Sequence, residues 1–423
     1  MNNTQVNLVS FFDGKDLDIR KSHNGRWIDQ KCTPDNISII CDCILHFSND
    51  NSQKNPLVFT SRDIWKSDYA FQTITNLYKK PSLNEATAKH EYDKFFQQPM
   101  KLLSYAGVLS EAKDKNENCF QIKNYQMLYY LSIREQNSLE FLIKYIEKVL
   151  KDSNLFSYFL DFLVHPSNGT YSDCKDIFTR FTKGYTKINN DRECWRIFTK
   201  VINPLAYSKN TFGSERGRMS SDIISYYSLM YNRTNFRDDG SNKPKNLTRA
   251  QLAQKSIGIK GSAYYDYVSK KAKEYVNYYN SKNNSGFSEV NNIRPMAQQN
   301  ISSRATQMHH IFPQSQFPEI CGDPENIIAL TPDEHNNLAH NNMHTQTINP
   351  FFQEKCLLSK LKTIKDCITE NLDPLYSFDD LLRVLSVGFK DKTILSIQRN
   401  NFSQVHDLII NHYKNICPGS ISI

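Results

Sequence analysis

The residues best suited to chemistry lie between Met308 and His340, in the stretch MHHIFPQSQFPEICGDPENIIALTPDEHNNLAH. Two adjacent histidines, His309 and His310, open a short apolar run that ends at Pro313. Imidazole has a pKa near ~6.5, so at neutral pH it can serve as a metal ligand or as a general base. A side-by-side pair can divide these roles between one ring that binds a metal ion and one that takes a proton from water.

The elements that must position this pair follow a strand, loop, strand and helix order. We expect a strand over 307–312, a Pro/Gly/Asp-rich loop over 313–325, a second strand over 326–330, and a helix capped by Thr331 or Asp333. The second strand begins with Asn326, and the helix contains His335. This order brings four side chains within reach of one another: His309, His310, Asn326 and His335.

Over residues 304–345 the chain resembles the HNH family of nucleases, whose fold is the ββα-metal motif. The resemblance rests on the dyad that opens the first strand, the Asn that heads the second, and the His nine residues after that Asn. It implies that His309 and His335 bind the metal ion and that His310 is the general base. It also implies that Asn326 orients His310, by accepting its Nδ1 proton so that Nε2 faces the water. The products would carry 5′-phosphate and 3′-hydroxyl ends.

Two features depart from the commonest pattern of that family. Many relatives carry a second His four residues after the helix His, but here that position is Ala339 and His340 follows. Five residues turn an α-helix by roughly 500°, about 140° away from His335, so we expect His340 outside the ligand set and His344 at the surface or on a phosphate. The C-x-x-C pairs of some relatives are missing, so neighbouring elements must support the module by packing.

The expected cofactor is one divalent metal ion per active site. With only two ring ligands, open positions remain for phosphate oxygens. Cellular abundance favours Mg²⁺, whereas the preference of imidazole nitrogen would also admit Mn²⁺, Ni²⁺ or Zn²⁺.

Positive charge is concentrated in residues 177–273, which hold 19 Lys and Arg against 7 Asp and Glu, compared with 52 and 44 in the whole chain. Such a window suits a polyanion, although a solvated helix surface would look the same. Aromatic residues interleave with the basic ones and could stack on bases. The residues that we expect to contact DNA are Arg216, Arg218, Arg233, Arg237, Lys243, Lys245 and Arg249.

The chain as a whole predicts a mainly α protein with small β elements, of the α+β class, in several domains. Residues 36–47 read as a strand or strand pair, and 138–165 have strong helical periodicity. Residues 57–125, with helices and then a hairpin with a charged tip, resemble a winged helix, although any small helical subdomain with a hairpin would look alike. We expect three regions: 1–135 for DNA recognition, 136–290 as a basic helical DNA-binding region, and 291–423 as the HNH module with C-terminal helices.

Other features narrow the class of protein. The N-terminus does not resemble a signal peptide, no apolar run approaches the length of a membrane span, and the ten cysteines never form C-x-x-C. We therefore expect a cytoplasmic protein with reduced thiols and no membrane partner.

The function that these observations imply is hydrolysis of double-stranded DNA by an HNH endonuclease. The large share of chain outside the module resembles type II restriction enzymes, which implies a homodimer on DNA and a cognate DNA methyltransferase as genetic partner. Two alternatives stay open: a DNA-binding regulator with a degenerate HNH module, and a less specific phage-defence nuclease.

Overall fold

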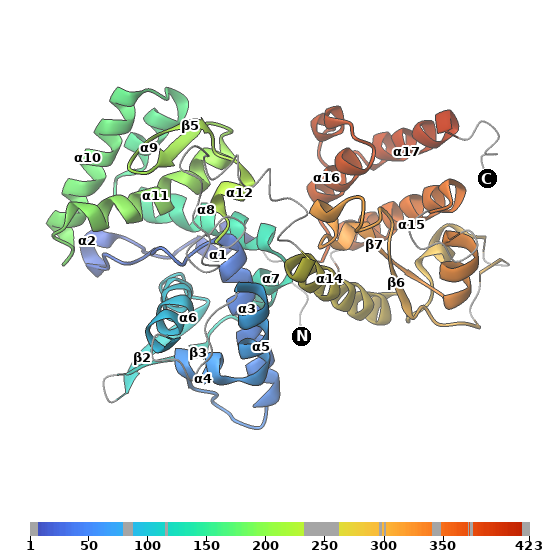
Figure 1. Ribbon diagram of the computed structural model, residues 1–423, viewed down its shortest axis with the longest axis horizontal. Helices are drawn as coiled ribbons and strands as arrows, with labels where there is room; N and C mark the ends of the chain where they lie inside the picture. The colour runs from blue at the N-terminus through green and yellow to red at the C-terminus, as the bar shows by residue number, and fades with distance from the viewer. Residues whose placement is uncertain are drawn as a thin grey trace. The chain divides into compact units, whose positions relative to one another are not determined.

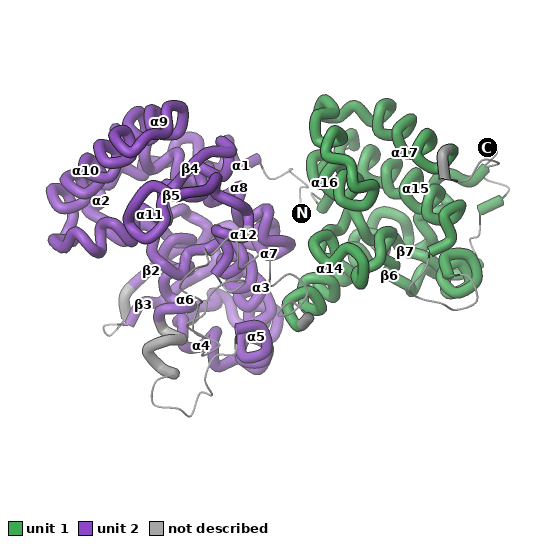
Figure 2. Tube along the Cα trace, turned by 45° about the horizontal axis from the view of Figure 1, so that its top comes forward, with its two compact units in different colours: residues 1–5, 262–423 green, residues 6–261 purple. Residues whose placement is uncertain are grey.

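The computed structural model describes residues 7–78, 88–114, 117–231, 262–295, 298–299, 302–340, 348–370, 372 and 375–416. Across these residues the chain is mainly helical with small antiparallel sheets, as the sequence predicts (Figure 1). The chain divides into two compact units, residues 6–261 and residues 1–5 with 262–423 (Figure 2). Among the described helices, none is both long enough and apolar enough to cross a membrane.

The N-terminal unit begins with a helix where we expected a strand. Residues 36–47 lie inside α3 (Pro34–Asp50), which follows the short helices α1 (Leu8–Phe12) and α2 (Ile19–Ser22). Every residue of α3 from Pro34 to Leu45 is buried. A helix that is buried all round loses its one-sided apolar stripe, and a run rich in Ile then reads as a buried strand.

A three-stranded sheet follows, in the order β1-β3-β2, with all neighbours antiparallel. Thr60 caps α4 with a reciprocal capping box to Asp63. The hairpin expected within residues 57–125 is present as β2–β3. The elements are β1 (Phe59–Thr60), α4 (Ser61–Lys66), α5 (Asp68–Tyr78), α6 (Ala88–Tyr105), β2 (Leu109–Asp114) and β3 (Glu117–Ile122).

Helices make up most of the rest of this unit, and the periodic stretch 138–165 forms α8 and α9 as predicted. Their apolar faces are rich in aromatic residues; the Phe159 ring, for example, packs on those of Phe178 and Phe198. The elements are α7 (Tyr125–Ile133), α8 (Glu135–Asp152), α9 (Phe156–Val164), α10 (Asn168–Tyr185), α11 (Asp191–Ser208), β4 (Phe212–Glu215), β5 (Arg218–Ile223) and α12 (Tyr226–Leu229).

The C-terminal unit is built around the short antiparallel hairpin of β6 and β7. The hairpin packs against α14 and η1, and α15 packs against η1 and η5. The elements are α14 (Ser262–Asn283), η1 (Glu289–Ile293), β6 (Gln307–His310), η3 (Pro318–Ile320), η4 (Pro324–Asn326), β7 (Ile327–Leu330), η5 (Glu334–Ala339), α15 (Pro350–Thr369), α16 (Phe378–Gly388), η7 (Lys392–Ser396) and α17 (Phe402–Ile416).

The compact units do not coincide with the three regions that we expected from the sequence. The C-terminal unit starts with α14, whereas one expected boundary, after residue 290, lies inside η1. The other, after residue 135, lies at the start of α8. The division of function among the three regions stays a prediction.

Candidate metal centre

The histidine pair lies on the first of the two predicted strands, β6. Strand β6 pairs with β7 in a register that sets His309 opposite Ile328 and His310 opposite Ile327. All four residues of β7 are buried, because α14 and η1 pack on the hairpin. Neighbouring residues on a strand point to opposite faces, so the two imidazoles leave the hairpin on different sides.

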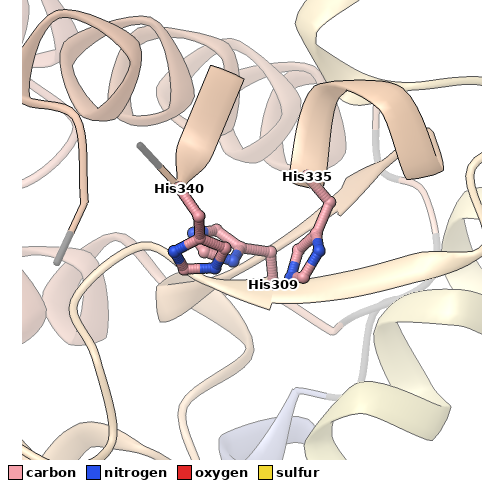
Figure 3. A group of neighbouring side chains, drawn as sticks. All are labelled: His309, His335 and His340. Carbon is pink, nitrogen blue, oxygen red and sulfur yellow. The ribbon is translucent and has the colours of Figure 1, made fainter. Parts of the chain in front are cut away.

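Three imidazoles converge on one side of the hairpin: His309 from β6, His335 from η5, and His340 just after η5 (Figure 3). One ring nitrogen from each lies within 4.8 Å of the others. The ring centroids are 5.2 Å apart for His309 and His335, 5.0 Å for His309 and His340, and 4.8 Å for His335 and His340. This cluster could hold a metal ion, and it is the only such group in the described part of the chain.

The position of His340 corrects our expectation that it would point away from His335. That expectation assumed an α-helix, but Glu334–Ala339 form a π-helix. A π-helix joins residues five apart by its hydrogen bonds, so His335 and His340 are separated by about one turn and share a face. Isolated π turns of this kind are frequent at functional sites.

Burial keeps the His309 ring neutral. Its pKa is lowered to about 3, chiefly by removal from water and then by the neighbouring rings of His335 and His340. A neutral imidazole has a free nitrogen lone pair, which is the form that binds a metal ion. His309 is therefore in its ligand form at neutral pH without loss of a proton.

His310 lies outside the cluster and is held by other partners. Its Nε2 is 3.0 Å from the carbonyl oxygen of Cys321 and 3.2 Å from Oγ of Ser269 on α14. A carbonyl oxygen only accepts, so Nε2 carries the proton and Nδ1 keeps the lone pair. Burial, with a smaller effect of the Lys273 ammonium, lowers the pKa of His310 to about 4. The tautomer is the reverse of the one that we expected.

Asn326 does not bond to the His310 ring. Its side chain accepts from the backbone N–H of Phe312 at 2.8 Å and donates to the carbonyls of Phe312 at 3.0 Å and Ile320 at 3.3 Å. Asn326 is fully buried. It therefore connects the two ends of the loop between the strands. Because this loop also carries the Cys321 carbonyl that contacts His310, Asn326 affects the position of His310 only indirectly.

A buried ion pair supports the hairpin. Glu289 accepts from the backbone N–H of Ala329 in β7 at 2.9 Å and is paired with Lys360 of α15 at 2.7 Å. Lys360 also donates to the Tyr376 hydroxyl at 3.1 Å. On the next segment Glu334 accepts from the N–H of Thr331. Packing and buried charges from neighbouring elements thus fix the module, as the lack of C-x-x-C pairs led us to expect.

Two of the predicted DNA contacts lie at the tip of the β4–β5 hairpin. Arg216 and Gly217 both have positive φ, of 52° and 80°, which is typical of a tight two-residue hairpin turn. Arg216 and Arg218 are exposed there. The other five predicted contacts lie outside the described residues: Arg233, Arg237, Lys243, Lys245 and Arg249. His344 lies outside them as well.

Sequence reasoning missed the residues that surround His310. Ser269 and the Cys321 carbonyl touch its ring, and Lys273 follows Ser269 by one turn of α14. A backbone carbonyl leaves no mark in the sequence, and helix 262–283 stands far from the motif along the chain. The sequence did contain one signal that His340 could join the cluster. Its spacing of five residues from His335 matches one turn of a π-helix.

Comparison with known proteins adds no relative: no protein family, curated protein or solved structure matches this chain.

Proposed function

We propose that this chain is a metal-dependent endonuclease of HNH type that hydrolyses double-stranded DNA. The observation that carries the proposal is the cluster of three imidazoles on one side of the β6–β7 hairpin, which could hold a metal ion. His309 joins two further imidazoles in a cluster, while His310 stays outside it with one nitrogen held by a carbonyl. A degenerate module that only binds DNA would have no need to keep four histidines so arranged.

The residues that would hold the ion are His309, His335 and His340. Three imidazole nitrogens suit Zn²⁺, Ni²⁺ or Co²⁺ better than Mg²⁺, which prefers oxygen ligands. Three protein ligands with an open position are typical of catalytic rather than structural zinc sites. We therefore favour a late first-row transition metal, such as Zn²⁺, Ni²⁺ or Co²⁺, over the Mg²⁺ that cellular abundance suggested. When bound, such an ion polarises a phosphodiester and stabilises developing negative charge.

His310 is the group that we assign to remove the proton from water. Its Nε2 proton is directed to the Cys321 carbonyl, so Nδ1 is the nitrogen that can accept. The water oxygen then forms a bond to phosphorus while the bond from phosphorus to the 3′-oxygen breaks, and the released 3′-oxygen takes a proton from solvent water. The products are a 5′-phosphate and a 3′-hydroxyl, as the resemblance to HNH nucleases implies.

Recognition of DNA would belong to the N-terminal unit. This unit contains helices α3 to α6 and a three-stranded sheet that includes the β2–β3 hairpin. Helices followed by such a hairpin support the interpretation of this region as winged-helix-like. The exposed Arg216 and Arg218 would contact phosphates. On this basis we propose a cytoplasmic type II restriction enzyme that acts as a homodimer and whose host is protected by a DNA methyltransferase.

The test is digestion of plasmid and phage DNA by the full chain with Zn²⁺, Ni²⁺, Mn²⁺ or Mg²⁺, with EDTA as control. Discrete fragments with 5′-phosphate ends support restriction, and a smear supports a less specific defence nuclease. Binding without cutting under every metal would reject the enzyme and favour the regulator.

A further inference from the structure

Helix α14 turns one face toward the β6–β7 hairpin and its loop. Ser269 on this face lies 3.2 Å from Nε2 of His310, and the carbonyl of Tyr265, one turn earlier, accepts from Sγ of Cys321 at 3.5 Å. Lys273 follows Ser269 by four residues in the same helix. Residues four apart share a helix face, so Lys273 belongs to the face that packs beside His310.

The Lys273 ammonium has no counter-ion within the described ranges. It forms no hydrogen bond or ion pair there, and the side chain is only partly exposed. Burial lowers its pKa, and the only neighbour that offsets this is the Cys321 thiol. Lys360, which is buried in this unit, is by contrast paired directly with Glu289. Because the Lys273 side chain is partly exposed and has no counter-ion within these ranges, its ammonium is available to an external anion.

The position of Lys273 relates it to His310. It lies one helical turn after Ser269, whose Oγ is 3.2 Å from Nε2 of His310. An ammonium beside this ring has three donors for the oxygens of a phosphate. It could neutralise the charge that grows on those oxygens during hydrolysis.

We infer that Lys273 is a phosphate-binding residue of this site and contacts a non-bridging oxygen of the phosphodiester next to His310. The identity of the anion rests on the proposed function. The existence of an anion site rests on the unpaired cation itself, so the two claims can fail separately.

The test is binding of a thymidine dinucleotide, which carries one phosphodiester, to the Zn²⁺-loaded full chain, followed by calorimetry. Its uncharged methylphosphonate analogue reports binding that does not depend on charge. The variants are Lys273→Met and Lys273→Arg. The matched control is Lys270→Met, because Lys270 lies on the same helix and is 81% exposed.

We expect Lys273→Met to weaken dinucleotide binding at least tenfold and to leave binding of the analogue unchanged. Lys273→Arg should retain most of the affinity, and Lys270→Met should match the wild type. Zn²⁺ affinity and the midpoint of thermal unfolding should not move, which excludes a folding defect.

Equal dinucleotide affinity in Lys273→Met and the wild type would overturn the inference, as would a wild type that does not prefer the charged dinucleotide. Binding through Lys273 by a protein that cuts no DNA would reject the proposed function and leave the inference standing. Cleavage of DNA together with dinucleotide binding that does not depend on Lys273 would support the proposed function and reject the inference.

Discussion

The rings of His309 and His340 lie 5.0 Å apart, although one belongs to a strand and the other follows a π-helix. The contact depends on the π turn, which places His340 on the same side as His335. In an α-helix His340 would point away from His335. The π turn instead makes it a third candidate metal ligand beside His309 and His335.

His340→Ala should weaken Zn²⁺ binding at least tenfold, and by about 100-fold if His340 is a direct ligand, since even outer partners of metal sites cost 10–100-fold. Calorimetry with the metal-free protein measures the Kd. The control is His406→Ala, an exposed histidine of the same unit. An unchanged Kd in His340→Ala would return this residue to the position that the sequence suggested, outside the ligand set.

Stability of the metal-free protein should fall as the pH falls from about 6.5 to about 5. In the unfolded chain a histidine has a pKa near ~6.5, whereas burial lowers the pKa of His309 to about 3 and that of His310 to about 4. The unfolded state therefore binds more protons in this window, and acid favours it. The loss is roughly 2 kcal/mol per imidazole at pH 5. Chemical denaturation at each pH measures it, and a flat profile that His310→Gln does not alter would contradict the burial of these rings.

Much of the candidate site could be predicted from the sequence because the signals were local. The apolar run of β7, the loop before it and the spacing of His309 and His335 all follow from short-range pattern. The helix around His335 was harder, because the period of an α-helix was the natural assumption and a π turn changes which residues meet. The role of Asn326 was misplaced because its partners are backbone groups of Phe312 and Ile320.

The fold too could be predicted only where the signal is local in the sequence. Amphipathic helices such as α8 keep one polar face and can be located from periodicity. The helix α3 has no exposed face over its first three turns, so its Ile-rich run could not be told from a strand. The supporting pair of Glu289 and Lys360 joins residues far apart in the chain, and no spacing rule connects them.

Lys360→Met should destabilise the hairpin, because it leaves the buried Glu289 carboxyl without a counter-ion. Loss of one member of a buried pair costs roughly 3–5 kcal/mol. Hydrogen exchange of the Ala329 amide, which bonds to Glu289, reports the local opening. Lys362→Met, on the same helix with an exposed side chain, is the control. If both variants exchange alike, the ion pair does not stabilise β7.

Arg216→Ala and Arg218→Ala should each reduce the salt dependence of DNA binding by about one unit of slope, because each removes one phosphate contact. Fluorescence anisotropy at several salt concentrations measures the slope. Arg399→Ala, a highly exposed arginine of the other unit, should leave it unchanged. Slopes equal to the wild type would place the two hairpin arginines among solvated surface charges.

The most direct test of the account is DNA cleavage by His310→Ala, measured beside its zinc content. The wild type should cut DNA with a bound metal ion, and EDTA should stop the cleavage. The variant should keep one zinc ion per chain and its DNA affinity but lose cleavage at least ~100-fold, because a general base contributes that much. Cleavage by His310→Ala near the wild-type rate, or a metal-loaded wild type that leaves DNA intact, would contradict the account.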